Sequence, residues 1–188
     1  MVTEADAPDT ASAISGNNVH GNDLGFADYL NTLSVSTVSN NQFVNNLHAN
    51  AQIYGSTSTW TGNTVSGAPY GLIASSSSGT ESVLNMTGNV FQNNTNYAIF
   101  VDSTPGLGSI TAHDNQFLSN ASGSDLTNTD VGDLTCNWWG STTGPNAPGN
   151  PSGTGDKLTT GAVYSPWAYS PTTYECGPEP IEIGRAHV

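Results

Sequence analysis

Basic residues are almost missing from this 188-residue chain, which holds two Lys or Arg residues against 15 Asp or Glu and has a formal net charge of −13. A surface that binds nucleic acid needs clusters of Lys and Arg to neutralise phosphates. Anionic membranes attract proteins through the same residue types. The composition therefore argues against both partners.

Helix-forming residues and long apolar runs are also scarce. Charged residues make up 9% of the chain, whereas about 25% is usual in a globular domain. Asn, Gly, Ser and Thr together form nearly half of the sequence, while the good helix formers are few. No apolar run approaches the roughly 20 residues that span a bilayer, and no signal peptide is visible. We expect an all-β protein without a transmembrane segment.

The two ends of the chain need separate treatment. Residues 183–188 are the translation of ATC GGA AGA GCA CAC GTC, a widely used sequencing adapter, so we interpret 182–188, including Arg185, as an artefact. Lys157 is then the one native Lys or Arg, and we expect the sequence to be a fragment. Residues 1–13 are read as a polar N-terminal segment or a truncated turn.

An internal repeat of 22 to 26 residues runs through residues 14–140. The pattern Asn-x-apolar recurs six times, and a second Asn follows five residues later in four of the copies. The leading residues are Asn17, Asn41, Asn63, Asn89, Asn115 and Asn137. The residues before each of them alternate as in a short strand, and further strands are expected at 51–54, 71–74 and 98–101.

A period near 24 residues with several short strands predicts one turn of a parallel β-helix, so six copies predict about six turns. The apolar anchors would stack in one internal column: Val19, Phe43, Val65, Phe91, Phe117 and Trp139. The Asn residues suit the bends, because they tolerate left-handed backbone and their amides can form ladders between turns. Leucine-rich repeats have a similar period, but their Leu-x-x-Leu-x-Leu signature is absent.

The repeat, Asn-x-apolar-x-x-Asn followed by Gly/Ala-Ile-x-Val, resembles the right-handed parallel β-helix repeats of the pectin-lyase-like superfamily. The element Cys136-Asn137-Trp138-Trp139-Gly140 and the Pro/Gly-rich residues after it resemble the closing element of secreted bacterial and archaeal surface proteins. The resemblance implies a right-handed coil over 14–140, closed by Trp138 or Trp139. A cap over 141–181 would follow, with Trp167 packed on the open end of the coil.

Two cysteines, Cys136 and Cys176, flank the expected cap. They could be two unrelated buried thiols, or a disulfide that closes a loop of about 40 residues and adds roughly 4 kcal/mol to the free energy of unfolding. We favour the disulfide, because an acidic repeat rich in Asn and Thr suits an extracellular, oxidising location.

Polysaccharide lyases and glycoside hydrolases are the best-known enzymes on this fold, and the chain supplies few of the groups they need. A lyase needs an Arg or Lys base, but Lys157 falls in the cap. A hydrolase needs carboxylates that converge from neighbouring turns, whereas Asp23, Asp102 and Asp114 lie at different phases of the repeat. The histidines are scattered in the same way. We predict no catalytic residue and keep a fragment of a carbohydrate-active enzyme as the alternative.

Ligand binding is the function class that remains. Aromatic side chains on a flat β-helix wall could stack on sugar rings, and the candidates are Tyr54, Trp60, Tyr70 and Tyr97. Asp125, Asp130 and Asp133 could offer oxygen ligands to calcium, although a solvated acidic loop is the simpler explanation; no other cofactor is expected. Ice binding, another use of flat β-helix walls, would need Thr-x-Thr in register on successive turns, but Thr57-Ser58-Thr59 does not recur, so we do not expect it.

The sequence thus predicts a non-catalytic, extracellular or cell-surface β-helix module that acts as a scaffold, an adhesion module or a carbohydrate-contact surface. The expected partners are a polysaccharide or cell-surface glycan and the neighbouring turns or domains of a longer chain.

Overall fold

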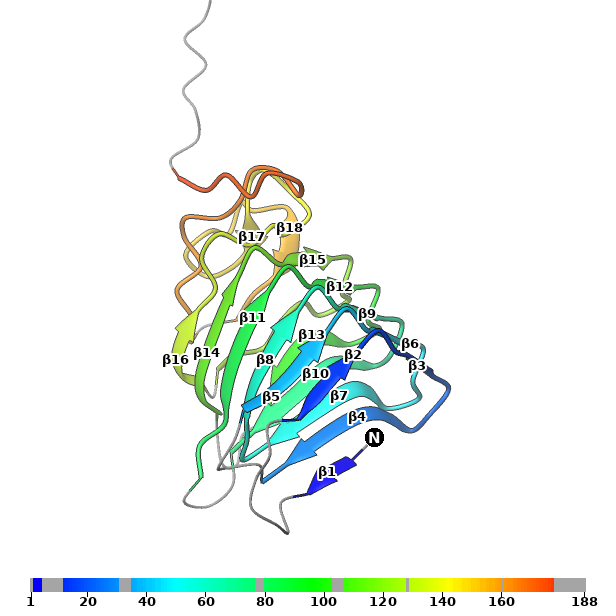
Figure 1. The fold of residues 1–188 in the computed structure, drawn as a ribbon. Coiled ribbons are helices and arrows are strands. Elements are labelled where there is room, and N and C mark those ends of the chain that lie inside the picture. Colours follow the sequence, from blue (N-terminus) through cyan, green and yellow to red (C-terminus); the bar gives the residue numbers. More distant parts are fainter. Residues whose placement is uncertain are drawn as a thin grey trace, which may run out of the picture.

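Three parallel β-sheets run along the molecule and enclose a core, so the chain forms a parallel β-solenoid (Figure 1). The computed structural model describes residues 2–4, 12–30, 35–76, 80–102, 107–127, 129–159 and 161–177. Within these ranges the chain forms strands, turns and bends but no helix. The all-β class predicted from the sequence is confirmed.

Each sheet takes one strand from each turn. Sheet A has the order β1-β4-β7-β10-β13, with the bounds Val2–Glu4, Leu24–Tyr29, Ala49–Tyr54, Tyr70–Ser75 and Tyr97–Val101. Sheet B has the order β2-β5-β8-β11-β14-β16, with the bounds Ala13–Ser15, Val35–Ser39, Thr57–Thr61, Val83–Thr87, Leu107–His113 and Thr129–Asp133. Sheet C has the order β3-β6-β9-β12-β15, with the bounds Asn18–His20, Gln42–Val44, Thr64–Ser66, Val90–Gln92 and Gln116–Leu118.

Four turns carry a strand in all three sheets, beginning with β2-β3-β4 and ending with β11-β12-β13. The coil continues with β14 and β15, after which sheet A is extended only by isolated bridges, first between Phe100 and Asp125 and then between Ser124 and Leu158. The last Asn motif contributes only a bridge between Gln116 and Trp138 to sheet C. The prediction of about six turns was therefore too high, because it counted turns that lack a full set of strands.

Left-handed residues make the corners between the sheets. The residue directly before each leading Asn has a positive φ: Gly16, Asn40, Gly62, Gly88, Asp114 and Cys136, at 53 to 68°. The leading Asn residues themselves are not among the positive-φ residues, so the prediction that they supply the left-handed backbone was wrong. Their role is to bond between turns, while Gly, Asn and Asp before them accept the left-handed conformation.

The six leading asparagines form a ladder along the coil, and all of them except Asn17 are buried. From Asn41 to Asn137, each Oδ1 accepts hydrogen bonds from both the backbone N–H and the Nδ2 of the asparagine one turn earlier, at 2.8–3.0 Å. The Nδ2 groups also donate to backbone carbonyls of the preceding turn, as Asn63 does to Val38 at 2.9 Å. The corner backbone is thus satisfied without water, which a buried corner requires.

The second Asn residues of the repeat form another ladder, and Asn50 bridges the corner of this ladder at which the second Asn is missing. The third copy has Ala68 where the first, second, fourth and fifth copies have Asn, so no amide is available at that corner. Asn46 Nδ2 instead donates to Asn50 Oδ1 at 2.8 Å, and Asn50 Nδ2 donates to Asn94 Oδ1 at 3.3 Å. A Cβ on Gly25, which has no side chain, would lie 2.7 Å from Asn46 Nδ2, so this approach needs glycine.

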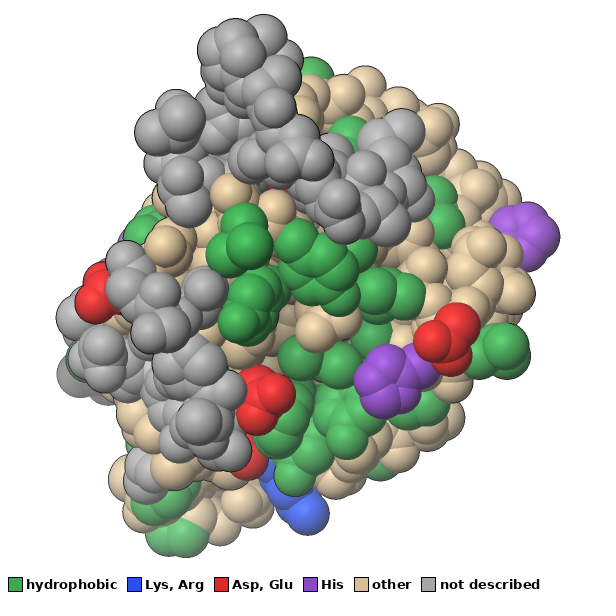
Figure 2. Space-filling model, turned by 90° about the horizontal axis from the view of Figure 1, so that it is seen from below, with side chains coloured by type: hydrophobic (Ala, Val, Ile, Leu, Met, Phe, Trp, Pro, Cys, Tyr) green, Lys and Arg blue, Asp and Glu red, His purple; other side chains and the backbone are tan. Residues whose placement is uncertain are grey.

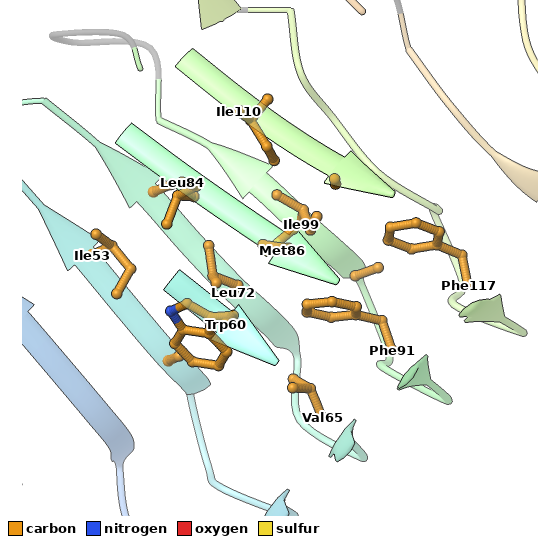
Figure 3. Packing of buried hydrophobic residues seen from close by; sticks show 14 of the residues in the cluster. Ile53, Trp60, Val65, Leu72, Leu84, Met86, Phe91, Ile99, Ile110 and Phe117 are labelled. Atoms are coloured by element: carbon orange, nitrogen blue, oxygen red, sulfur yellow. The ribbon is translucent and has the colours of Figure 1, made fainter. Parts of the chain in front are cut away.

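The hydrophobic core lies between the three sheets (Figure 3). The rings of Phe91 and Phe117 stack with centroids 5.5 Å apart, and Trp139 stacks on Phe117 at 4.5 Å. Phe43 is buried in the same column, whereas Val19, in the first complete turn, is only partly buried. A continuous internal column thus joins turns that could not bury these side chains alone.

The coil ends in an irregular cap that a disulfide ties to the last turn. Cys136 and Cys176 are bonded, with their Cα atoms 5.2 Å apart, so the predicted bridge is present. The short strands β17 (Pro145–Asn146) and β18 (Gly155–Lys157) pair in parallel within the cap. Trp167 Nε1 donates to the Thr142 carbonyl at 3.0 Å, and its ring lies against Gly144. Residues 182–188, which the sequence led us to interpret as an artefact, lie outside the described residues.

Candidate functional site: the outer face of sheet A

Aromatic side chains gather on the outer face of sheet A. The parallel register aligns Tyr70 with Tyr97, and Ile73 with Phe100, on adjacent strands. Tyr70 lies 6.1 Å from Tyr97 with nearly parallel rings, and Phe100 lies 5.3–5.5 Å from both of them. His48 adds a fourth ring at 5.5 Å from Tyr70. We call these four residues the aromatic cluster. Its two Tyr and Phe100 are half-buried and His48 is exposed, so ring surface remains open to solvent.

A second pair of rings lies on the same face. Tyr29 and Tyr54 are aligned across β4 and β7, with ring centroids 6.0 Å apart. The Tyr29 hydroxyl donates to Gln52 Oε1 at 2.6 Å, and burial raises the pKa of that phenol. Seen from below, on the side where β1 and β4 lie in Figure 1, the molecule shows a patch of hydrophobic side chains with histidine and acidic groups beside it (Figure 2).

The structure separates the aromatic residues that the sequence put forward. Tyr54, Tyr70 and Tyr97 share the outer face of sheet A. Trp60 does not, because it is fully buried and its Nε1 donates to Ser58 Oγ at 2.8 Å. Trp60 therefore belongs to the core and cannot contact a ligand on this wall. Phe100 and His48, which the sequence argument did not select, complete the cluster.

Asp125, one of the acidic residues considered for calcium, caps a turn. Asp125 Oδ1 accepts from the Thr127 N–H, the Thr127 hydroxyl and the Thr159 hydroxyl at 2.7–3.1 Å. Burial alone would raise the pKa of Asp125, but these hydrogen bonds outweigh it and lower the pKa. Among the residues with described side chains, no three His, Cys, Asp or Glu gather as metal ligands do. The side chain of Asp130 lies outside the described residues.

Asp133 is held in the same way and also pairs with a histidine. Its carboxylate accepts from the Thr135 N–H and hydroxyl, and Oδ2 lies 3.1 Å from His113 Nε2. Burial alone would raise the pKa of Asp133, but the hydrogen bonds from Thr135 and the interaction with His113 outweigh it and lower the pKa. The Thr135 hydroxyl also lies 3.3 Å from the same His113 nitrogen. Because carboxylate and hydroxyl share one nitrogen, the imidazole cannot relay a proton between them as in a catalytic triad.

The sequence analysis missed a regular polar wall on the outer face of sheet B. The register aligns Thr37, Thr59, Asn85 and Thr111 in one column, and Ser39, Thr61, Thr87 and His113 in the next. These positions lie four and two residues before each leading Asn, so an alignment on that Asn would have shown them. Thr57-Ser58-Thr59 itself does not recur, because Val35-Ser36-Thr37 and Val83-Leu84-Asn85 are aligned with it, and Asn85 and His113 interrupt the two columns.

Comparisons with known proteins identified no relative of this chain. No protein-family model, curated protein or solved structure matches the chain. The likeness to the pectin-lyase-like superfamily therefore stays a resemblance of sequence pattern and of solenoid architecture. A search of the described residues for a helix long and apolar enough to cross a membrane found none.

Proposed function

We propose that the chain is a non-catalytic β-solenoid module of an extracellular or cell-surface protein, and that the outer face of sheet A contacts carbohydrate. The aromatic cluster is the observation that carries this proposal. Tyr, Phe and His rings present flat apolar surfaces on which the C–H faces of a sugar can pack, and the phenol hydroxyls of Tyr70 and Tyr97 can bond to sugar hydroxyls.

The geometry of the wall suits an extended ligand. Tyr70 and Tyr97 come from consecutive turns, and Tyr29 and Tyr54 come from the two turns before them. The parallel strands are about 4.8 Å apart, so each pair places two rings on neighbouring turns. The two pairs lie at opposite ends of the strands, because Tyr54 is aligned with Ser75 whereas Tyr70 is aligned with Ala49. A polysaccharide that lies diagonally across sheet A would meet both pairs and would gain affinity from several weak contacts.

The disulfide supports the extracellular part of the proposal. Disulfides form and persist in oxidising compartments, and the bridge between Cys136 and Cys176 closes the cap of this chain. The low content of basic residues agrees with a role away from nucleic acid.

The positions of the ionisable groups support the proposal that the module is non-catalytic. His20, His48 and His113 lie on three different turns. His113 is paired with Asp133, and Asp125 Oδ1 accepts from two threonine hydroxyls. Among the described side chains no three His, Cys, Asp or Glu gather, and the Thr135 hydroxyl lies beside the His113 nitrogen that faces Asp133. This arrangement differs from the two facing carboxylates that glycoside hydrolysis uses.

Retention on polysaccharides tests the proposal. We expect the protein to be retarded in gels that contain a soluble neutral polysaccharide from a panel of glucans, mannans, xylans and galactans. The double substitution Tyr70→Ala with Tyr97→Ala should abolish the retardation, because it removes two stacking surfaces. Trp138→Ala is the matched control, since it removes a half-buried ring from the side of sheet C.

Three results would overturn the proposal. The first is migration that no polysaccharide of the panel changes. The second is retardation that survives the double substitution, and the third is an equal reduction of the retardation by Trp138→Ala. Circular dichroism of each variant establishes that the solenoid is still folded.

A further inference from the structure

An open groove of about 550 Å³ lies where the cap meets the last turn. It extends the wall of sheet A, because residues 123–125 hydrogen-bond to β13 and residues 157–159 hydrogen-bond in turn to Ser124. The polar lining consists of Ser122, Thr127, Asn146, Lys157 and Thr159, and Pro148 and Pro151 add apolar surface. The groove is thus separate from the aromatic cluster but lies on the same side of the coil.

Backbone hydrogen bonds hold the walls of this groove in place. The Ser124 N–H donates to the Lys157 carbonyl at 2.9 Å, and the Thr159 N–H donates to the Ser124 carbonyl at 3.0 Å. The Leu158 N–H donates to the Asn146 carbonyl at 3.0 Å. At Gly123, which has a φ of +72°, a Cβ would lie 2.1 Å from the Lys157 carbonyl oxygen. A groove with walls fixed in this way is formed before any ligand arrives.

Lys157 gives the groove a positive charge that no carboxylate among the described side chains neutralises. It is the only Lys or Arg in the described part of the chain, and it is exposed. The one ion pair found among the described residues joins His113 to Asp133, so the ammonium group of Lys157 has no carboxylate partner there. In a protein with a net charge of −13, this cation stands out as a site for a carboxylate.

Thr127 and Thr159 determine which chemical groups the other end of the groove can bind. The hydroxyls of Thr127 and Thr159 donate to Asp125 Oδ1 at 2.7 and 2.9 Å. Because their protons are used, their oxygens can only accept. Thr159 Oγ1 already accepts from the Leu126 N–H at 2.9 Å and keeps one lone pair, so a ligand hydroxyl can still donate to each threonine oxygen. Asp125 itself disfavours an anion at this end.

We propose that the groove binds a hydroxylated carboxylate of monosaccharide size, such as a sugar acid. The carboxylate would lie on Lys157 Nζ, the ligand hydroxyls on Thr127 and Thr159, and the apolar face of the ring on Pro148 and Pro151. This site goes beyond the carbohydrate contact proposed for sheet A, because it adds a second position with a defined preference for charge.

Titration of the isotope-labelled protein with three sugars of one size tests the proposal by NMR. The probes are glucuronate, glucose and glucosamine, which are anionic, neutral and cationic. Physiological ionic strength is needed, because the net charge repels anions when screening is weak. We expect glucuronate to bind most tightly and to shift the amide signals of Lys157 and Thr159. Lys157→Gln should weaken glucuronate binding about tenfold or more, as loss of a charged hydrogen bond does.

Gln42→Glu is the matched control, since it changes the net charge by the same amount at an exposed position on β6. It should leave the affinity for glucuronate unchanged. Equal binding of the three sugars, shifts confined to other parts of the protein, no shifts at all, or an unchanged affinity in Lys157→Gln would each overturn the proposal. None of these results depends on retention by polysaccharides, so the two proposals can fail separately.

Discussion

Asn50 shows how much one side chain contributes to this fold. It replaces the amide that Ala68 cannot supply, and it joins the second ladder across the third corner. Asn50→Ala would leave Asn46 Nδ2 and Asn94 Oδ1 with fewer partners in a buried place. Since an unsatisfied buried polar group costs about 1–3 kcal/mol, we expect the free energy of unfolding to fall by that amount or more. Urea unfolding followed by circular dichroism measures it.

Asn18→Ala is the control for this prediction. Asn18 is exposed and stands next to the leading Asn17 without belonging to either ladder. A loss in Asn50→Ala no larger than the loss in Asn18→Ala would contradict the bridging role.

Asp156 ends the second ladder and makes it sensitive to pH. Its Oδ2 accepts from the Asn120 N–H at 3.1 Å and from Asn120 Nδ2 at 2.6 Å. Burial raises the pKa of Asp156, although the hydrogen bonds from Asn120 and Ser119 oppose the rise. A pKa above that of the unfolded chain means that folding favours the protonated acid. The stability from this group is present below the unfolded pKa and is lost as the pH rises through the folded pKa.

Asp156→Asn therefore should gain stability over the wild type as the pH rises. The amide oxygen keeps both bonds to Asn120 without carrying a charge. Thermal unfolding at a series of pH values should show the difference between variant and wild type widening from the acid range toward neutral pH. A difference that stays constant, or that narrows with rising pH, would contradict the assigned direction of the pKa.

At the scale of the element, each three-residue strand of sheet C serves mainly to place one inward side chain. On β12, Phe91 is buried in the aromatic column while Val90 and Gln92 point outward and are half-buried. Phe91→Ala should lower the free energy of unfolding by about 3–5 kcal/mol, since a large side chain is removed from a packed core. Val90→Ala on the same strand should cost much less. Chemical unfolding of both variants tests this prediction. An equal loss of the free energy of unfolding in the two variants would show that the aromatic column does not contribute more to core packing than the outward residues do.

The elements also show what the sequence could predict. The leading Asn residues and the anchors keep a fixed spacing, because the corner between sheets B and C never changes length. The aromatic cluster is harder to predict, since the corner before sheet A varies in length: three residues lie between Ser66 and Tyr70, and four lie between Gln92 and Tyr97. Tyr70 and Tyr97 are therefore aligned in space but out of phase in the repeat. Asp156 completes a ladder from 36 residues away, which no local pattern indicates.

At the scale of the whole molecule, the disulfide decides how firmly the cap closes the coil. The bridge between Cys136 and Cys176 spans 40 residues of sequence. Its removal should lower the free energy of unfolding by roughly 4 kcal/mol, because the unfolded chain gains conformational freedom. We expect Cys136→Ser with Cys176→Ser to unfold at a lower temperature than the wild type, and the wild type in reductant to match the variant. An unfolding temperature that reductant does not change would contradict this.

The account depends most on the claim that the outer face of sheet A meets carbohydrate. Saturation-transfer NMR tests that claim directly, with an oligosaccharide cut from whichever polysaccharide retards the protein. Irradiation of ring protons should transfer saturation to the sugar in the wild type, and the transfer should vanish in the double variant Tyr70→Ala with Tyr97→Ala. Transfer of equal strength in the double variant, or no transfer from the wild type, would contradict the account.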